Sequence, residues 1–233
     1  MSLLSTRGLT RRFGGLTAVD GVDLDLGTGE IRALIGPNGA GKTTLVGLIC
    51  GRIAPSAGTI RFEGRDITGL PAHARVGLGI AYTFQITAIY ARLPVFDNVA
   101  LAVQRRGAAD LAAETLTALD RVGLADRAGQ TAGTLAYGHQ RLLEVAMGLA
   151  LAPKLLILDE PTQGLADTEI ETFKRLVREV ARSATVLLIE HNMELVMDLA
   201  DRITVLNFGE VLAEGTPAEI RADRAVQAAY LGA

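Results

Sequence analysis

Cysteine is almost absent from this sequence, because Cys50 is the only one among 233 residues. A disulfide framework is therefore excluded, which is typical of proteins of the reducing cytosol. The three histidines, His73, His139 and His191, do not have the spacing of a zinc site with this cysteine. We expect Cys50 to be a small buried hydrophobe in a helix.

Long apolar runs are missing too. The N-terminus lacks the apolar core of a signal peptide, and no uninterrupted apolar stretch approaches about 18 residues. Any link to a membrane is therefore expected to go through a partner. The net charge is −3, from 23 basic and 26 acidic residues, and no basic stripe is present. Nucleic acid is accordingly not expected as a partner.

What the sequence does contain is a large apolar fraction, 49%, which can fill a sizeable core. Its 233 residues are enough for one large α/β domain or for a core with one inserted subdomain. Residues 19–26 alternate between apolar and polar side chains, as a half-exposed antiparallel strand does. Continuous apolar runs instead predict strands buried on both faces of a parallel sheet. The predicted strands are residues 3–13, 19–26, 31–35, 59–63, 155–158, 186–189, 203–206 and 210–213, with the last two forming a hairpin.

Between residues 85 and 135 the strand signals fade and helical spacing takes over. Leu111, Thr115, Leu119 and Val122 follow one another at intervals of four, four and three. We interpret residues 85–135 as an inserted helical subdomain. Residues 1–84 and 136–233 are then expected to form the core and an antiparallel β subdomain.

A complete phosphate-binding loop lies between a predicted strand and a predicted helix. Its glycines let successive backbone N–H groups close around phosphate oxygens, and the following helix adds its N-terminal partial positive charge. Lys42 is expected to reach the β- and γ-phosphates, and the Thr43 hydroxyl to ligate Mg²⁺. The loop consists of Gly36, Pro37, Asn38, Gly39, Ala40, Gly41, Lys42, Thr43 and Thr44. It predicts that the chain binds a nucleoside triphosphate.

Polar groups follow both of the long apolar runs. Asp159 and Glu160 end the first, and an adjacent carboxylate pair can hold Mg²⁺ and also activate the attacking water. His191 follows the second run and is a candidate contact for the γ-phosphate. Ligands bind at the carboxyl ends of strands in such sheets. The segment Leu135–Gln140, a glycine-containing turn before a helix, is a second candidate anion site.

In this order, these motifs resemble the ATP-binding subunits of ABC transporters over essentially the whole chain. The resemblance implies an α/β P-loop NTPase fold with a mixed or parallel sheet, an N-terminal antiparallel β subdomain and the inserted helical subdomain. It implies ATP and Mg²⁺ as cofactors and ATP hydrolysis coupled to transport. The roles it implies are adenine stacking for Phe13 with Val19 nearby, Mg²⁺ sensing for Gln85, Mg²⁺ association for Asp159, general base for Glu160, γ-phosphate contact for His191, and the signature for Ala136, Tyr137 and Gly138.

Within that family, the chain is similar to ATP-binding subunits of branched-chain amino-acid importers. The strings that support this are Arg-Phe-Gly-Gly-Leu, Tyr-Gly-His-Gln-Arg-Leu-Leu-Glu-Val-Ala, Ile-Glu-His-Asn-Met-Glu-Leu-Val-Met and Ala-Tyr-Leu-Gly. The expected partners are two integral-membrane permeases, a second ATP-binding subunit of the same or a different kind, and indirectly a solute-binding protein. The expected location is the cytoplasmic face of the plasma membrane, as a peripheral protein.

Three departures from the family pattern stand out. Ala136 replaces the signature serine, whose hydroxyl donates to the γ-phosphate of the facing ATP. Ala166 stands where Asp or Asn is usual, with Asp167 beside it, and the stretch 105–111 is short. Other substrates (urea, amides or lipid) and a soluble ABC ATPase without a transport role remain alternatives. The apolar residues Ile86, Ile89, Tyr90 and Phe96 are expected either to contact the membrane partner or to form the core of the subdomain.

Overall fold

This computed structural model describes residues 2–83 and 88–231. The chain divides into two compact units, residues 1–78 with 184–233 and residues 79–183. The strands of the first unit are β1 (Ser2–Phe13), β2 (Leu16–Gly27), β3 (Ile31–Ile35), β4 (Ala57–Phe62), β5 (Arg65–Asp66), β8 (Thr185–Ile189), β9 (Arg202–Asn207) and β10 (Glu210–Gly215). Its helices are α1 (Lys42–Ile49), α2 (Ala72–Leu78), α7 (Met193–Leu199), α8 (Pro217–Ala222) and α9 (Arg224–Leu231).

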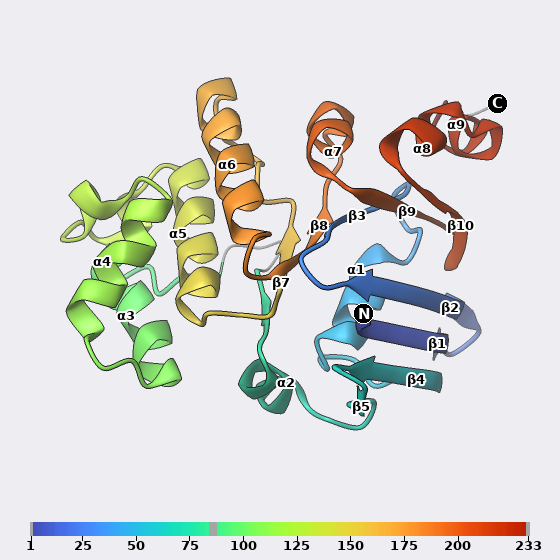
Figure 1. Cartoon of the computed structure of the whole chain (residues 1–233), viewed down its shortest axis with the longest axis horizontal. Helices are drawn as coiled ribbons and strands as arrows, with labels where there is room; N and C mark the ends of the chain where they lie inside the picture. The colour runs from blue at the N-terminus through green and yellow to red at the C-terminus, as the bar shows by residue number, and fades with distance from the viewer. Residues whose placement is uncertain (1, 84–87, 232–233) are drawn as a thin grey trace. The chain divides into compact units, whose positions relative to one another are not determined.

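The antiparallel sheet of the first unit has the strand order β2-β1-β4-β5 (Figure 1). In β2, Val22, Leu24 and Leu26 are buried, whereas the aspartates between them are exposed. The alternation in the sequence therefore predicted the orientation of this strand correctly, because side chains on a strand point to opposite faces in turn.

The other sheet of this unit is mixed, since β3 pairs in parallel with both β8 and β9, and β10 pairs with β9 antiparallel. Every residue of β3 is buried, including Arg32. This cation lies 2.7 Å from a carboxylate oxygen of Glu214 and 2.5 Å from one of Glu30, and it donates to Thr204 Oγ1 at 2.8 Å. Pairing of this kind is what makes a charge tolerable inside a sheet. The α/β fold class expected from the sequence is confirmed.

The C-terminal helices pack against this mixed sheet (Figure 1). Val196 of α7, Ile220 of α8 and Val226 of α9 join Ala33 and Ile35 of β3 in one hydrophobic cluster. This packing anchors β3, and with β3 the loop that follows it.

A buried arginine holds the C-terminal end of α1. The Arg75 guanidinium donates to the carbonyls of Leu48 and Ile49 at 2.7 and 2.8 Å, and also to those of Leu70 and Thr68. The last carbonyls of a helix have no partner within the helix, and a cation there also complements the helix dipole. Burial lowers the pKa of Arg75. Cys50, which follows α1, is buried as expected.

The second unit contains β6 (Ile80–Tyr82), β7 (Leu155–Asp159), α3 (Val95–Arg106), α4 (Leu111–Arg121), α5 (Tyr137–Ala150) and α6 (Asp167–Val180), with short 3-10 turns at Ala125–Arg127 and Ala132–Thr134. Helices α3, α4 and α5 pack on one another (Figure 1), and β6 pairs in parallel with β7. Thr115, Leu119 and Val122 are buried, whereas Leu111 in the first turn of α4 is 40% exposed. Three of the four residues at helical spacing are therefore buried, and Leu111 lies at the exposed start of α4.

Across residues 2–83 and 88–231, none of the helices combines the length and the apolar character that crossing a bilayer requires.

Candidate functional site

The predicted phosphate loop joins β3 to α1, as its strand and helix patterns required. Gly41 caps α1 with φ 102° and has no side chain to satisfy the first N–H groups of the helix. Those donors have no partner within the helix, so the loop and the helix start offer backbone N–H groups and a partial positive charge to an anion. Asn38, Gly39 and Thr43 are exposed, and Pro37 and Thr44 are partly exposed.

Two of the loop glycines are fixed by close approach of other strands. A Cβ at Gly36 would lie 2.2 Å from the Leu206 carbonyl oxygen at the end of β9. A Cβ at Gly41 would lie 2.4 Å from the Ala18 carbonyl oxygen of β2. Both distances are far below van der Waals contact, so these positions accept glycine alone without movement of the loop.

Lys42, the first residue of α1, has its side chain buried within the loop. Its Nζ donates to the carbonyl oxygens of Gly36 at 2.6 Å and Pro37 at 3.0 Å. The cation is thereby held against the loop backbone, where a phosphate would replace part of these contacts. The arrangement fits a phosphate group, because the loop and the helix start offer backbone N–H groups and the lysine supplies the charge.

Phe13 ends β1 and is 44% exposed, with the Arg11 guanidinium 4.4 Å from its ring centroid. A cation over an aromatic face is attracted by the ring quadrupole. Arg11 is itself held by a hydrogen bond to the Ala54 carbonyl at 2.9 Å. Val19, which the sequence suggested as a neighbour of the base, lies in β2 and is fully buried. Phe13, rather than Val19, presents a surface to a ligand.

His191 leaves the same sheet edge as the phosphate loop. Strands β8 and β3 are adjacent and parallel, with Ile189 beside Leu34, so the segment after β8 and the loop after β3 emerge in one direction. His191 is exposed, and its backbone N–H donates to Glu190 Oε2 at 3.1 Å. The adjacent Asn192 caps α7 by accepting from the Leu195 N–H at 3.1 Å. This topology brings His191 to the edge that the sequence predicted.

In the second unit, Asp159 ends β7 and is almost fully buried. Its Oδ2 accepts from the Tyr82 hydroxyl at 2.8 Å, and its N–H donates to Thr83 Oγ1 at 3.2 Å. These bonds from the neighbouring strand β6 fix the orientation of the carboxylate. Sequence reasoning missed Tyr82, although a tyrosine that ends a strand parallel to β7 was the available signal.

Glu160 follows directly and has a φ of 49°, which is unusual for a residue other than glycine. Strained backbone of this kind persists where the surrounding structure imposes it, and it is frequent at functional sites. Thr43 and Asp159 carry hydroxyl and carboxylate oxygens, the donors that Mg²⁺ prefers. Mg²⁺ is commonly held by one or two carboxylates and the phosphates of the substrate, so the donor chemistry of each residue fits the ion. Gln85, the third predicted ligand, lies outside the described residues.

The predicted signature forms the start of α5. Ala136 occupies the N-cap position with φ −57° and ψ 150° and contributes no side-chain hydrogen bond. A Cβ at Gly138 would lie 2.6 Å from the Gly164 carbonyl oxygen, and Tyr137 Oη donates to Gln163 Oε1 at 3.3 Å. The signature is therefore in contact with the loop that follows Glu160. The side chains of Ala136 and Tyr137 are exposed, and Gly138 is buried.

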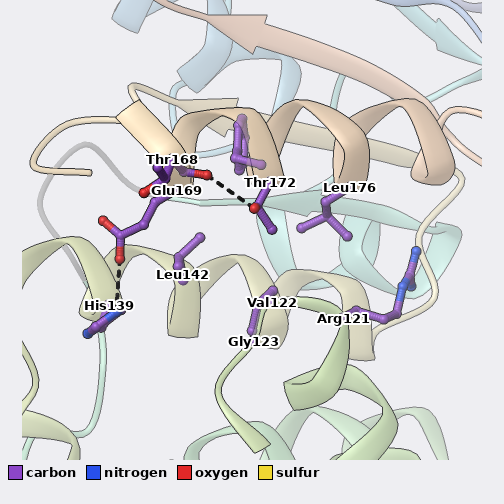
Figure 2. A pocket seen from close by; sticks show the side chains of 10 residues that line it. Arg121, Val122, Gly123, His139, Leu142, Thr168, Glu169, Thr172 and Leu176 are labelled. Carbon is purple, nitrogen blue, oxygen red and sulfur yellow. Dashed lines mark hydrogen bonds and ion pairs between the residues drawn. The ribbon is translucent and has the colours of Figure 1, made fainter. Parts of the chain in front are cut away.

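A salt bridge joins α5 to α6 beside this contact. His139 Nε2 lies 3.0 Å from Glu169 Oε1 (Figure 2). The other carboxylate oxygen, Glu169 Oε2, accepts from the Ala166 N–H at 2.8 Å. A pocket of about 270 Å³ continues from there along the two helices toward Arg121, with Leu142 and Leu176 in its lining. The sequence showed neither the pocket nor the salt bridge, since both depend on which faces of α5 and α6 meet.

Comparison with known proteins agrees with these motifs. The profile of the family described as ABC transporter matches residues 19–163, and that of the branched-chain amino acid ATP-binding cassette transporter matches residues 210–233. The chain is 40% identical over 252 residues to the high-affinity branched-chain amino acid transport ATP-binding protein BraF of Pseudomonas aeruginosa, and 40% over 249 residues to LivG of Escherichia coli. These alignments cover 99% of this chain and 98% of each relative.

Solved structures show the same likeness. The ADP conformation of MJ1267, an ATP-binding cassette of an ABC transporter, superimposes with a TM-score of 0.90 at 28% identity and covers 100% of both chains. A relative named for another role, the lipopolysaccharide export system ATP-binding protein LptB of Escherichia coli, is 36% identical over 243 residues, an alignment that covers 100% of this chain. The chain therefore belongs to the ABC transporter family, as one of its ATP-binding and ATP-hydrolysing subunits.

Proposed function

We propose that the chain energises an importer of branched-chain or other hydrophobic amino acids. The observation that carries this proposal is the full-length match, at 40% identity, to two ATP-binding proteins named for branched-chain amino-acid transport. The C-terminal match, at residues 210–233, supports the same assignment, because it lies outside the part shared with ABC transporters in general.

The residues have distinct roles in this proposal. Lys42 and the N–H groups of residues 36–44 bind the β- and γ-phosphates of ATP, and the exposed ring of Phe13 stacks on adenine. Thr43, Asp159 and Gln85 hold Mg²⁺, which neutralises charge on the phosphates. Glu160 accepts a proton from the attacking water, and His191 contacts the γ-phosphate.

The partners follow from the family. Two permeases in the membrane form the transport path, and a second ATP-binding subunit completes the pair, with a solute-binding protein on the far side. The chain then lies at the cytoplasmic face of the membrane. In this proposal the inserted subdomain predicted at residues 85–135, which includes the described helices α3 and α4, contacts the permeases. Within it Tyr90 is 56% exposed, whereas Ile89 and Phe96 are half-buried, and Ile86 lies outside the described residues.

A second candidate function is export of a lipid, and the likeness to LptB favours it. Its 36% identity is close to the 40% of the amino-acid transport relatives, and it covers the chain as fully. Identity between ATP-binding subunits does not identify the cargo, because these subunits bind ATP rather than the transported solute. The membrane partners distinguish the two functions.

The experiment is affinity purification of the tagged chain from detergent-solubilised membranes of its host, followed by uptake assays in a strain that lacks it. We expect two permeases and a second ATP-binding subunit to co-purify. The strain that lacks the chain should lose uptake of labelled leucine, isoleucine and valine. The unmodified chain should restore this uptake, and Lys42→Ala should not. Normal amino-acid uptake with co-purification of a lipid-export permease would instead establish the second candidate.

A further inference from the structure

The turn between β9 and β10 is bonded to the phosphate loop. The Gly209 N–H donates to the Ala40 carbonyl at 3.0 Å, and the Gly209 carbonyl accepts from the Asp20 N–H at 2.9 Å. One residue thus binds the phosphate loop on one side and β2 on the other. All three segments belong to the first unit.

There is little room for a side chain at Gly209. Its φ is +86°, and a Cβ there would lie 3.0 Å from the Ala18 carbonyl oxygen and 3.3 Å from the Val19 Cα. The same oxygen of Ala18 lies 2.4 Å from the Cβ position of Gly41 in the phosphate loop. A displacement of Ala18 by a side chain at position 209 would therefore change its close contact with the phosphate loop.

The neighbouring Phe208 shows that this turn is held by its backbone contacts. Phe208 has a φ of 47°, unusual for an aromatic residue, and its side chain is 87% exposed. An exposed ring gives little packing to hold a strained conformation. Strain of this kind persists only where surrounding contacts impose it. Here those contacts are the pairing of Asn207 with Glu210, which closes the two-residue hairpin turn, and the two hydrogen bonds of Gly209.

We propose that Gly209 is a positioning residue for nucleotide binding, which holds the phosphate loop in its binding conformation from outside the nucleotide motifs. The inference rests on the proposed binding of ATP by residues 36–44. It assigns to the β9–β10 turn a part in ATP affinity, because the loop is braced between this turn and Ala18 of β2.

The test compares Gly209→Ala with Gly64→Ala in the full chain. Gly64 has a similar φ of +76°, but a Cβ there meets nothing within 4 Å. Both substitutions impose the same backbone strain, and only the one at Gly209 displaces β2. We expect the Kd for a trinitrophenyl ATP analogue to rise at least about tenfold in Gly209→Ala and to stay within about twofold in Gly64→Ala. The melting temperature without nucleotide should fall in both.

Equal nucleotide affinity of the two variants would overturn the proposal. Lys42→Ala in the same assay separates this outcome from failure of the proposed function. If Lys42→Ala loses the analogue and Gly209→Ala keeps it, only the positioning role fails. If Lys42→Ala also keeps the analogue, ATP binding by the loop itself is refuted.

Hydrogen exchange of the unmodified chain gives a second measurement, which does not depend on whether a variant folds. ATP should slow exchange of the Gly209 and Asp20 amides, because a filled loop holds the turn more firmly. Amides of the turn that contains Gly64 should exchange at an unchanged rate. Unchanged exchange at Gly209 and Asp20 with ATP bound would contradict the coupling between turn and loop.

Discussion

Restoring serine at position 136 has two separable consequences. Ala136 is the N-cap of α5 and provides no side-chain acceptor for the first N–H groups of that helix. Its exposed position and extended backbone leave room for a hydroxyl. A serine cap in place of alanine stabilises a helix by about 1 kcal/mol. For a chain of this length, that corresponds to a rise in melting temperature of about 2–4 °C.

Thermal unfolding of the isolated Ala136→Ser chain measures this first consequence. Ala166→Ser is the matched control, because Ala166 is the N-cap of α6 in the same unit, again without a side-chain cap. Glu169 already accepts from the Ala166 N–H, so serine there completes the reciprocal pair of bonds. Both variants should gain similar stability. A fall in melting temperature in either would refute the capping argument.

The second consequence concerns phosphate binding in the assembled transporter. A hydrogen bond to a charged group contributes about 1.5–3 kcal/mol. If position 136 contacts the γ-phosphate of the facing ATP, Ala136→Ser should raise the steady-state ATPase rate of the complex. Ala136→Ser could instead stabilise the chain as much as Ala166→Ser does and leave the ATPase rate unchanged. Serine at 136 would then act only as a helix cap, and the expected rise in ATPase rate would be refuted.

Two further substitutions test how the site is supported. Arg75→Met removes the donor to the terminal carbonyls of α1, so we expect the free energy of unfolding in urea to fall by about 3 kcal/mol or more. Arg75→Lys should be intermediate. A fall of less than about 1 kcal/mol in Arg75→Met would contradict this role. Gly138→Ala forces a Cβ to 2.6 Å from the Gly164 carbonyl and should cost about 1–3 kcal/mol of stability. Gly129→Ala, where nothing lies within 4 Å, should be nearly neutral, and an equal effect of both would refute the close contact at the signature.

Most of the strands were predictable from the sequence because their patterns follow from burial alone, whereas the short β5 and β6 were not predicted. The run at residues 155–158 and the alternation in β2 each reflect how many faces of a strand are covered. The phosphate loop was equally visible, since its glycines and lysine occur at fixed spacing. The run at 31–35 predicted a strand in spite of Arg32. The structure shows that the cation is tolerated there because the carboxylates of Glu30 and Glu214 pair with it.

Other features depend on contacts between distant segments. Sequence reasoning did not anticipate α6, α8 or α9. The bond from Tyr82 to Asp159 joins residues on two strands, and the His139–Glu169 pair depends on which faces of α5 and α6 meet. No local pattern encodes such pairings.

Hydrolysis by the assembled complex with Glu160→Gln tests the central claim most directly. The amide keeps the size of the side chain but cannot accept a proton from water. General base catalysis contributes about 10²–10⁴ in rate. We predict a loss of ATP hydrolysis of at least about a hundredfold, with the Kd for ATP unchanged and amino-acid transport abolished. Hydrolysis at the unmodified rate in Glu160→Gln would contradict the assignment of the base and the mechanism built on it.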